Sequence, residues 1–185
     1  MIGYKPTAIE KGESVKEVMR YYARCNREIN ANMAKIIGEK IDNPMGLALR
    51  GYFFPTLGKL LEHIYIADMV WIKAFGTVDS CGLDFEKELG PTPEYKDNVF
   101  ADFDAYRGKR AALDEFIVRC ADLIDESSFG KKVVRVNRKG ERTEKDVWKA
   151  VLHCFNHQTH HRGHVSCILD ELGIENDYSY MIRIE

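Results

Sequence analysis

The stretch VWKAVLHCFNHQTHHRGHVSCILDEL, residues 147–172, lies in a predicted helix of about residues 145–172 that stops at Gly173. Its apolar residues recur at helical spacing and define one face: Val147, Val151, Cys154, Phe155, Val165, Leu169 and Leu172. Five of the chain's six histidines fall between His153 and His164. A helix with one apolar face buries it against other helices, so this stretch favours a helical bundle with histidines at the edge of its interior.

Three further segments have a helical pattern of apolar residues, at about residues 14–37, 56–75 and 97–124. Ser14 and Glu17 form a capping box at the start of the first segment. The intervening residues 38–55 and 76–97 are interrupted by Gly and Pro and are predicted to be loops. Trp71 and Trp148 are predicted to lie in the core.

A short β-hairpin is predicted just before the last helix. Residues 132–137 contain the β-branched run around Val134, residues 141–146 follow, and Gly140 supplies the turn between them. The expected fold is therefore all-α, a single four-helix bundle domain over residues 1–185 with one hairpin inserted.

Composition limits the classes of partner. With 185 residues, 45% hydrophobic and 30% charged, the chain has the composition of one soluble globular domain. The formal net charge of -2 gives no electrostatic reason to expect nucleic acid or a membrane as a partner. No apolar run reaches the roughly 18 residues of a membrane span, and residues 1–16 lack the apolar core of a secretory signal. The five cysteines form no CxxC pair, which favours free thiols in the cytoplasm.

The histidine cluster predicts a metal site. Residues four apart on a helix lie one above the other, and two imidazoles at that spacing can bind one transition metal. Spacing alone leaves three pairs open, namely His153 with His157, His157 with His161, and His160 with His164. On a helical wheel His161 borders the apolar face and His157 lies about 40° further out. Facing therefore favours His157 and His161.

A third ligand is expected from another helix, because two histidines alone make a weak site. The remaining histidine, His63, borders the apolar side of the second helical segment. His63, His157 and His161 would form a three-histidine site with open coordination positions, as in catalytic metal centres. Zinc and nickel suit imidazole ligands best.

Other catalytic motifs are missing or incomplete. A helical metalloprotease uses HExxH, whereas Gln158 stands at the position of the general-base glutamate. The chain has neither a GxSxG elbow nor a GxxxxGK phosphate loop.

Several polar residues near the histidines have two readings each. Arg162 could hold the carboxylate of a substrate or cofactor, or form a structural ion pair within the bundle. Asp68 could orient a ligand imidazole or pair with an arginine, and the second reading is favoured. Cys154 is expected to be a small buried hydrophobic residue rather than a fourth ligand.

The segment from Asn156 to His164, NHQTHHRGH, closely resembles the signature of the DinB-like (DinB/YfiT) superfamily, whose usual form is N-H-x-T-H-H-R-G-Q. The resemblance extends to residues 57–71, to Asn26 and to the hairpin, and so covers nearly the whole chain. His164 departs from the signature, because glutamine is usual there. The resemblance implies an up-down-down-up bundle, commonly a homodimer.

The same resemblance implies a divalent metal held by three histidines, which fall here on His63, His157 and His161. Some members of the superfamily are metal-dependent transferases or isomerases that use a low-molecular-weight thiol such as mycothiol or bacillithiol. The first hypothesis is therefore a thiol-dependent S-transferase or isomerase that acts on an electrophilic small molecule. The alternatives are a non-catalytic, DNA-damage-inducible metal-binding protein and, less favoured, a metal-dependent hydrolase.

The first helical segment carries more apolar surface than a bundle interior needs. Tyr21 and Tyr22 stand in tandem, and Ile29, Met33 and Ile36 follow at helical spacing. This surplus agrees with a homodimer. Coverage of the same surface by the chain's own long loops is the competing explanation.

Overall fold

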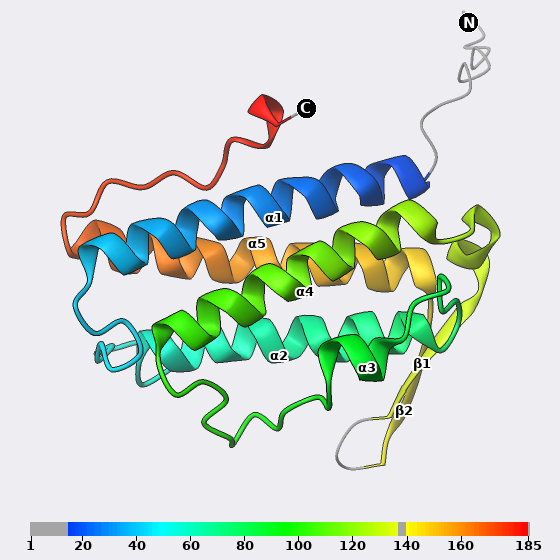
Figure 1. Ribbon diagram of the computed structural model, residues 1–185, viewed down its shortest axis with the longest axis horizontal. Coiled ribbons are helices and arrows are strands. Elements are labelled where there is room, and N and C mark those ends of the chain that lie inside the picture. Colours follow the sequence, from blue (N-terminus) through cyan, green and yellow to red (C-terminus); the bar gives the residue numbers. More distant parts are fainter. Residues whose placement is uncertain (1–14, 137–139, 185) are drawn as a thin grey trace, which may run out of the picture.

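The computed structural model describes residues 15–136 and 140–184, which form a bundle of four long helices (Figure 1). These helices are α1 (Val15–Lys40), α2 (Leu57–Gly76), α4 (Phe103–Leu123) and α5 (Val147–Glu171). α1 and α5 run in one direction, and α2 and α4 run in the other, which is up-down-down-up connectivity. α1 packs against α4 and α5, and α2 packs against the same two helices. The predicted all-α bundle is confirmed.

The smaller elements join the long helices. They are the short helix α3 (Phe85–Leu89), the 3-10 turns η1 (Glu126–Gly130) and η2 (Met181–Arg183), and the strands β1 (Lys132–Val136) and β2 (Arg142–Asp146). β1 pairs with β2 in antiparallel register, with Val134 opposite Glu144. The predicted hairpin is confirmed, and residues 137–139 of its turn lie outside the described residues.

Helix boundaries differ from the sequence prediction where local contacts compete with helical periodicity. α4 begins at Phe103 instead of residue 97, because the Asp102 carboxylate accepts a hydrogen bond from the backbone N–H of Ala105 at 2.8 Å and caps the helix there. α5 begins at Val147, because the preceding residues pair in β2. α1 continues to Lys40, and Ser14, its predicted cap, lies outside the described residues.

Two further predictions about these segments were wrong in detail. The predicted loop at residues 76–97 contains α3, whose N-cap Asp84 accepts a hydrogen bond from the backbone N–H of Lys87 at 3.0 Å. Trp148 is 39% exposed instead of lying in the core, because it follows the start of α5 on the outer side of the bundle. Trp71 is half-buried and packs against the core.

The loop between α1 and α2 packs closely on the start of α2. A Cβ atom at Gly58 would lie 2.5 Å from the carbonyl oxygen of Met45, so a larger residue would push the loop away. The loop is also held by its backbone, because the N–H of Leu57 donates to the carbonyl of Leu47 at 2.9 Å. This close approach brings Phe54 against α2.

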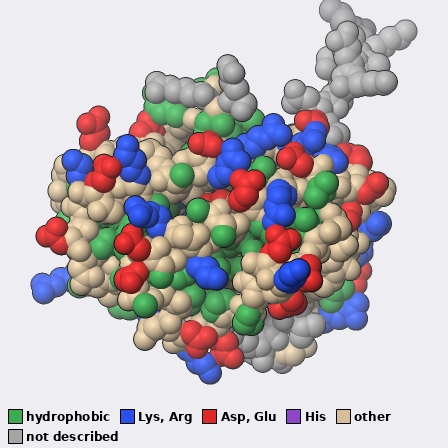
Figure 2. All heavy atoms as spheres, in the orientation of Figure 1, with side chains coloured by type: hydrophobic (Ala, Val, Ile, Leu, Met, Phe, Trp, Pro, Cys, Tyr) green, Lys and Arg blue, Asp and Glu red, His purple; other side chains and the backbone are tan. Residues whose placement is uncertain are grey.

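The face formed by α1 and α4 carries acidic and basic side chains interspersed with one another (Figure 2). Some of them join the two helices, because Arg20 donates to Asp122 at 2.9 Å and Arg27 donates to Glu115 at 3.1 Å. Among the described residues, no helix is both long and apolar enough to span a bilayer.

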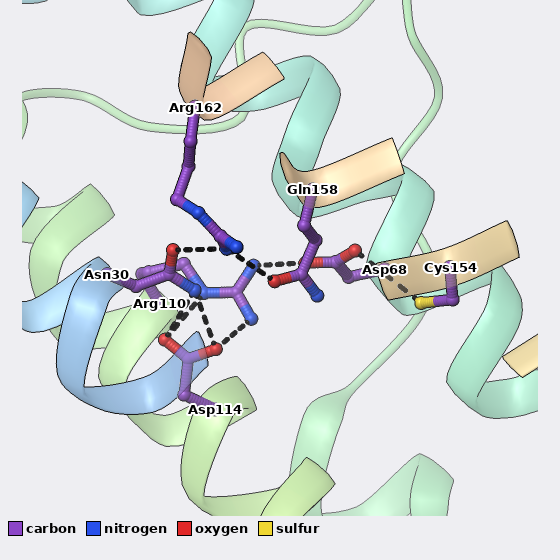
Figure 3. Close-up of polar contacts among 7 residues, drawn as sticks. All are labelled: Asn30, Asp68, Arg110, Asp114, Cys154, Gln158 and Arg162. Carbon is purple, nitrogen blue, oxygen red and sulfur yellow. Dashed lines mark hydrogen bonds and ion pairs between the residues drawn. The ribbon is translucent and has the colours of Figure 1, made fainter. Parts of the chain in front are cut away.

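A buried polar network joins all four long helices (Figure 3). Arg110 of α4 donates to Asp68 of α2 at 2.6 Å and to Asp114 at 2.5 Å and 3.0 Å, and each of these three residues is at most 3% exposed. The amide nitrogen of Asn30 on α1 donates to Asp114 at 3.1 Å. The structure thus agrees with the favoured reading of Asp68 as the partner of an arginine.

The network continues onto α5. Arg162 donates to the Gln158 amide oxygen at 3.2 Å and to the Asn30 amide oxygen at 3.5 Å. Arg162 and Gln158 are both buried, and through Asn30 they connect α5 to the group around Arg110. Every helix of the bundle contributes at least one polar side chain to this buried layer.

We expect Arg110→Ala to lower the free energy of unfolding by about 3–5 kcal/mol, because it leaves the carboxylates of Asp68 and Asp114 buried without their cation. Urea unfolding followed by circular dichroism measures the change. Arg107→Ala is the matched control, since Arg107 lies on the exposed side of α4 and forms a surface ion pair with Asp104 at 3.1 Å. A loss below about 1 kcal/mol for Arg110→Ala would contradict a central role for the network.

Candidate metal centre

The structure brings together the three histidines that the sequence predicts as ligands. Nε2 of His157 lies 3.0 Å from Nε2 of His63 and 3.1 Å from Nε2 of His161. His63 comes from the second turn of α2, and the other two residues lie one turn apart on α5, which packs against α2. Their candidate ligand atoms all lie within 4.8 Å of one another.

This arrangement fits a divalent metal better than a set of hydrogen bonds. The single Nε2 of His157 faces two other Nε2 atoms, and one N–H can donate well to only one of them. Three nitrogens on a tetrahedral zinc at about 2.0–2.1 Å lie about 3.3 Å apart, close to the spacing here. A cation would satisfy all three lone pairs at once.

The three imidazoles are held in the neutral form that a metal requires. Burial lowers the pKa of His63 below its ordinary value. Burial, and then the neighbouring His63, lower the pKa of His157 to about 4. Burial, and then the neighbouring His157, lower the pKa of His161 to about 3. At neutral pH these side chains therefore offer lone pairs and carry no repelling charge.

An apolar cavity of about 380 Å³ opens beside His63. Its wall is largely aromatic, formed by Phe53 and Phe54 of the loop before α2 and by Tyr95 of the loop after α3. The Phe54 ring lies 4.9 Å from the ring of His63 and 5.8 Å from that of His161, measured between centroids. Phe54 thus packs against two of the three candidate ligands, and the cavity gives a small molecule room next to them.

Glu62 also lines this cavity, and both of its carboxylate oxygens accept hydrogen bonds. One oxygen accepts a hydrogen bond from the Lys59 amine at 2.7 Å, and the other accepts from the backbone N–H of Val99 at 2.9 Å. The side chain is buried and fixes the segment before α4 against α2. Glu62 therefore joins α2 to the segment that precedes α4.

The other ring nitrogens lack the partners that often orient metal-binding histidines. Nδ1 of His157 and Nδ1 of His161 are buried, and no hydrogen-bond partner for them lies within residues 15–136 and 140–184. Asp68, the carboxylate considered for this role, bonds Arg110 instead. Packing against Phe54 and within the histidine cluster fixes the rings.

The remaining histidines of α5 point elsewhere. His153 packs against Trp71, with 5.2 Å between ring centroids. His160 is exposed and His164 is half-buried on the outer side of the helix. The wheel argument that selected His157 and His161 thus agrees with the way α5 faces α2.

Arg162 lies apart from the three imidazoles, in the buried network. It also lines a cavity of about 260 Å³ between α5 and the C-terminal segment, together with Thr159 and Tyr178. This cavity shares no lining residue with the one beside His63. Arg162 bonds Gln158 and Asn30 within the bundle, and its binding of a cofactor stays a prediction.

Cys154 lies in the same interior. Its Sγ is 3.9 Å from the Asp68 carboxylate, and the residue is buried. Burial raises the pKa of its thiol well above the ordinary value. Cys154 is therefore a protonated interior side chain, in keeping with the sequence reading.

Sequence reasoning did not identify Phe54, Tyr95 or Glu62 as neighbours of the site. Glu62 directly precedes His63, and a carboxylate on the buried side of a helix is a signal that could have been noticed. Phe54 and Tyr95 come from loops, whose path depends on contacts far away in the sequence.

We expect tight metal binding to depend on the three converging histidines. Alanine at His63, His157 or His161 should each abolish retention of the metal through gel filtration, because it removes one of three ligands. The same change at His153 should leave retention unchanged, since its ring packs on Trp71. Metal analysis of the purified variants measures this. Equal loss in His153→Ala would mean that the wrong face of α5 was chosen.

Acid should release the metal only at unusually low pH. Ligand pKa values lowered to about 4 and about 3 mean that protons compete for the imidazoles only near that range. The metal is therefore expected to stay bound down to about pH 5 and to leave as pH falls further. Dialysis against chelator-free buffers of decreasing pH tests this. Release with a midpoint above about pH 6 would contradict the buried, neutral state of the ligands.

Comparisons with known proteins identify the family of the chain. The model of the DinB family matches residues 11–185. Protein DinB of Bacillus subtilis (strain 168) is 23% identical over 126 residues, which cover 65% of this chain and 66% of that protein. No solved structure gave a significant match. Since the family model spans the four helices, the hairpin and all three converging histidines, the chain belongs to the DinB family.

Proposed function

We propose that the protein is a metal-dependent enzyme, an S-transferase or isomerase that uses a low-molecular-weight thiol. One observation carries the proposal: three neutral imidazoles converge on one point beside an apolar cavity of about 380 Å³. Among the described residues, no cysteine, aspartate or glutamate joins this group. Three ligands leave room for a small molecule at a fourth position, as in catalytic centres.

The chemistry requires a thiol to react as its thiolate. A bound divalent ion would supply Lewis acidity that lowers the pKa of a thiol from about 8.5 toward neutrality. His63, His157 and His161 would hold the ion, and zinc or nickel suits this ligand set. Phe53, Phe54 and Tyr95 would receive the apolar body of an electrophilic substrate and exclude water from it.

Hydrolysis is less favoured by the same site. A metal-dependent hydrolase needs a base to activate water, and Gln158 stands where a zincin carries glutamate. The carboxylate at the cavity, Glu62, already accepts hydrogen bonds at both oxygens.

The five free cysteines fit a reducing compartment, and we place the reaction in the cytoplasm.

We expect a thiol to change the spectrum of the cobalt-substituted protein. Cysteine, bacillithiol and mycothiol would be titrated in turn, and a new sulfur-to-cobalt charge-transfer band marks binding. The competent thiol should then form a thioether with an activated aryl chloride at a rate that depends on the metal. His153→Ala is the matched control and His63→Ala the inactive variant. A spectrum unchanged by every thiol at millimolar concentration would favour the non-catalytic alternative.

We also propose that the protein is a homodimer. Exposed apolar side chains lie in the first turns of two neighbouring helices, Val15 and Val18 on α1 and Trp148 and Leu152 on α5. Tyr22 and Phe155 stack beside them, with 5.2 Å between ring centroids. Sedimentation at micromolar concentration should give twice the chain mass of 21.3 kDa. A single species at that chain mass, unchanged by concentration, would exclude the dimer.

A further inference from the structure

A second pair of histidines lies on the outer side of α5. His160 and His164 are one turn apart, with 4.3 Å between their ring centroids. His160 is exposed and His164 is half-buried, so the pair lies at the surface of the helix. Imidazoles at this spacing on a helix can chelate one transition metal ion.

His161 adjoins the outer pair as well. Its ring lies 4.8 Å from that of His160 and 5.2 Å from that of His164, and one ligand atom from each of the three lies within 4.8 Å of the others. We assign His161 to the inner group, because its Nε2 is 3.1 Å from Nε2 of His157. The outer pair then remains as an independent set of ligands.

The surroundings of the outer pair suit a cation. Arg162, which stands between the two histidines in the chain, is only 4% exposed and donates inward to Gln158. Its charge is therefore directed away from the outer surface. A Cβ atom at Gly163 would meet nothing within 4 Å, so the helix surface beside the pair is open. Water can complete the coordination there.

The outer pair includes the position at which the chain departs from the signature. The signature that the helix resembles carries glutamine where His164 stands, and glutamine does not supply an imidazole lone pair. The three converging histidines do not require His164. Replacing His164 by the usual glutamine therefore removes the outer pair while leaving the inner group intact.

We propose that His160 and His164 bind a second divalent transition metal ion, exchangeable with solvent and separate from the ion of the inner site. Two imidazoles plus water bind more weakly than three imidazoles in a half-buried site. Nickel and copper should bind here more tightly than zinc, following the general order of affinity for nitrogen ligands. The proposal does not depend on whether the inner site is catalytic.

Equilibrium dialysis of the untagged, metal-stripped protein against nickel tests the proposal. The unmodified chain should bind two nickel ions, one tightly and one weakly. His164→Gln and His160→Gln should each lose the weak ion and keep the tight one. His153→Gln, a change of the same kind on the same helix, should keep both ions. Circular dichroism confirms that each variant is folded.

A further variant distinguishes the inner site from the outer one. His63→Gln should lose the tight ion and keep the weak one. If it loses neither, the inner site is misassigned while the outer one stands. The outer site is overturned if the unmodified chain binds one nickel ion even at millimolar nickel, or if the second ion survives His164→Gln. It is also overturned if a folded His63→Gln variant loses both ions.

Discussion

The ion pair of Arg110 with Asp68 and Asp114 is the interaction on which the rest of the structure depends. It places one cation between two carboxylates in the interior, where removal of Arg110 leaves both carboxylates without their counter-ion. Asn30 extends the layer to α1, and Arg162 and Gln158 extend it to α5 (Figure 3). Hydrogen bonds have direction, so this layer fixes the rotation of each helix about its axis more strictly than apolar packing does.

The rotation of α5 is what the candidate metal centre needs. Gln158 and Arg162 each follow a candidate ligand by one residue, so they stand about 100° around the helix from His157 and His161. Because Gln158 and Arg162 form hydrogen bonds in the interior, His157 and His161 face α2. His63 lies on that helix. Asp68 lies five residues beyond His63 on α2, so the same layer also fixes the other half of the centre. The buried network thus sets the rotation of the two helices that carry the candidate metal centre.

The sequence was sufficient to predict features that depend on a single helix, such as which of its side chains face the bundle. The apolar stripe of α5, and the position of the histidines relative to it, predicted which imidazoles face the bundle. Arg110 and Asp114 were not identified, although their spacing of four residues on a buried face could have revealed a buried pair. Phe54 and Tyr95 could not be placed, because their positions follow from how two loops cross α2. Trp148 was misjudged, since an aromatic residue near a helix end can pack on the outer surface.

Three pairs of side chains on α5 share the same spacing of four residues. His157 with His161, Gln158 with Arg162, and His160 with His164 are each four residues apart, and each pair points in a different direction. The first faces α2, the second faces the interior, and the third faces solvent. A shift of one residue in the register of α5 would, depending on its direction, move His157 and His161 into the charged interior or move Gln158 and Arg162 to the ligand positions. The buried network opposes such a shift, because Arg162 and Gln158 would lose their partners. The geometry of the candidate metal centre is therefore set in part by buried residues that are not among its three histidines.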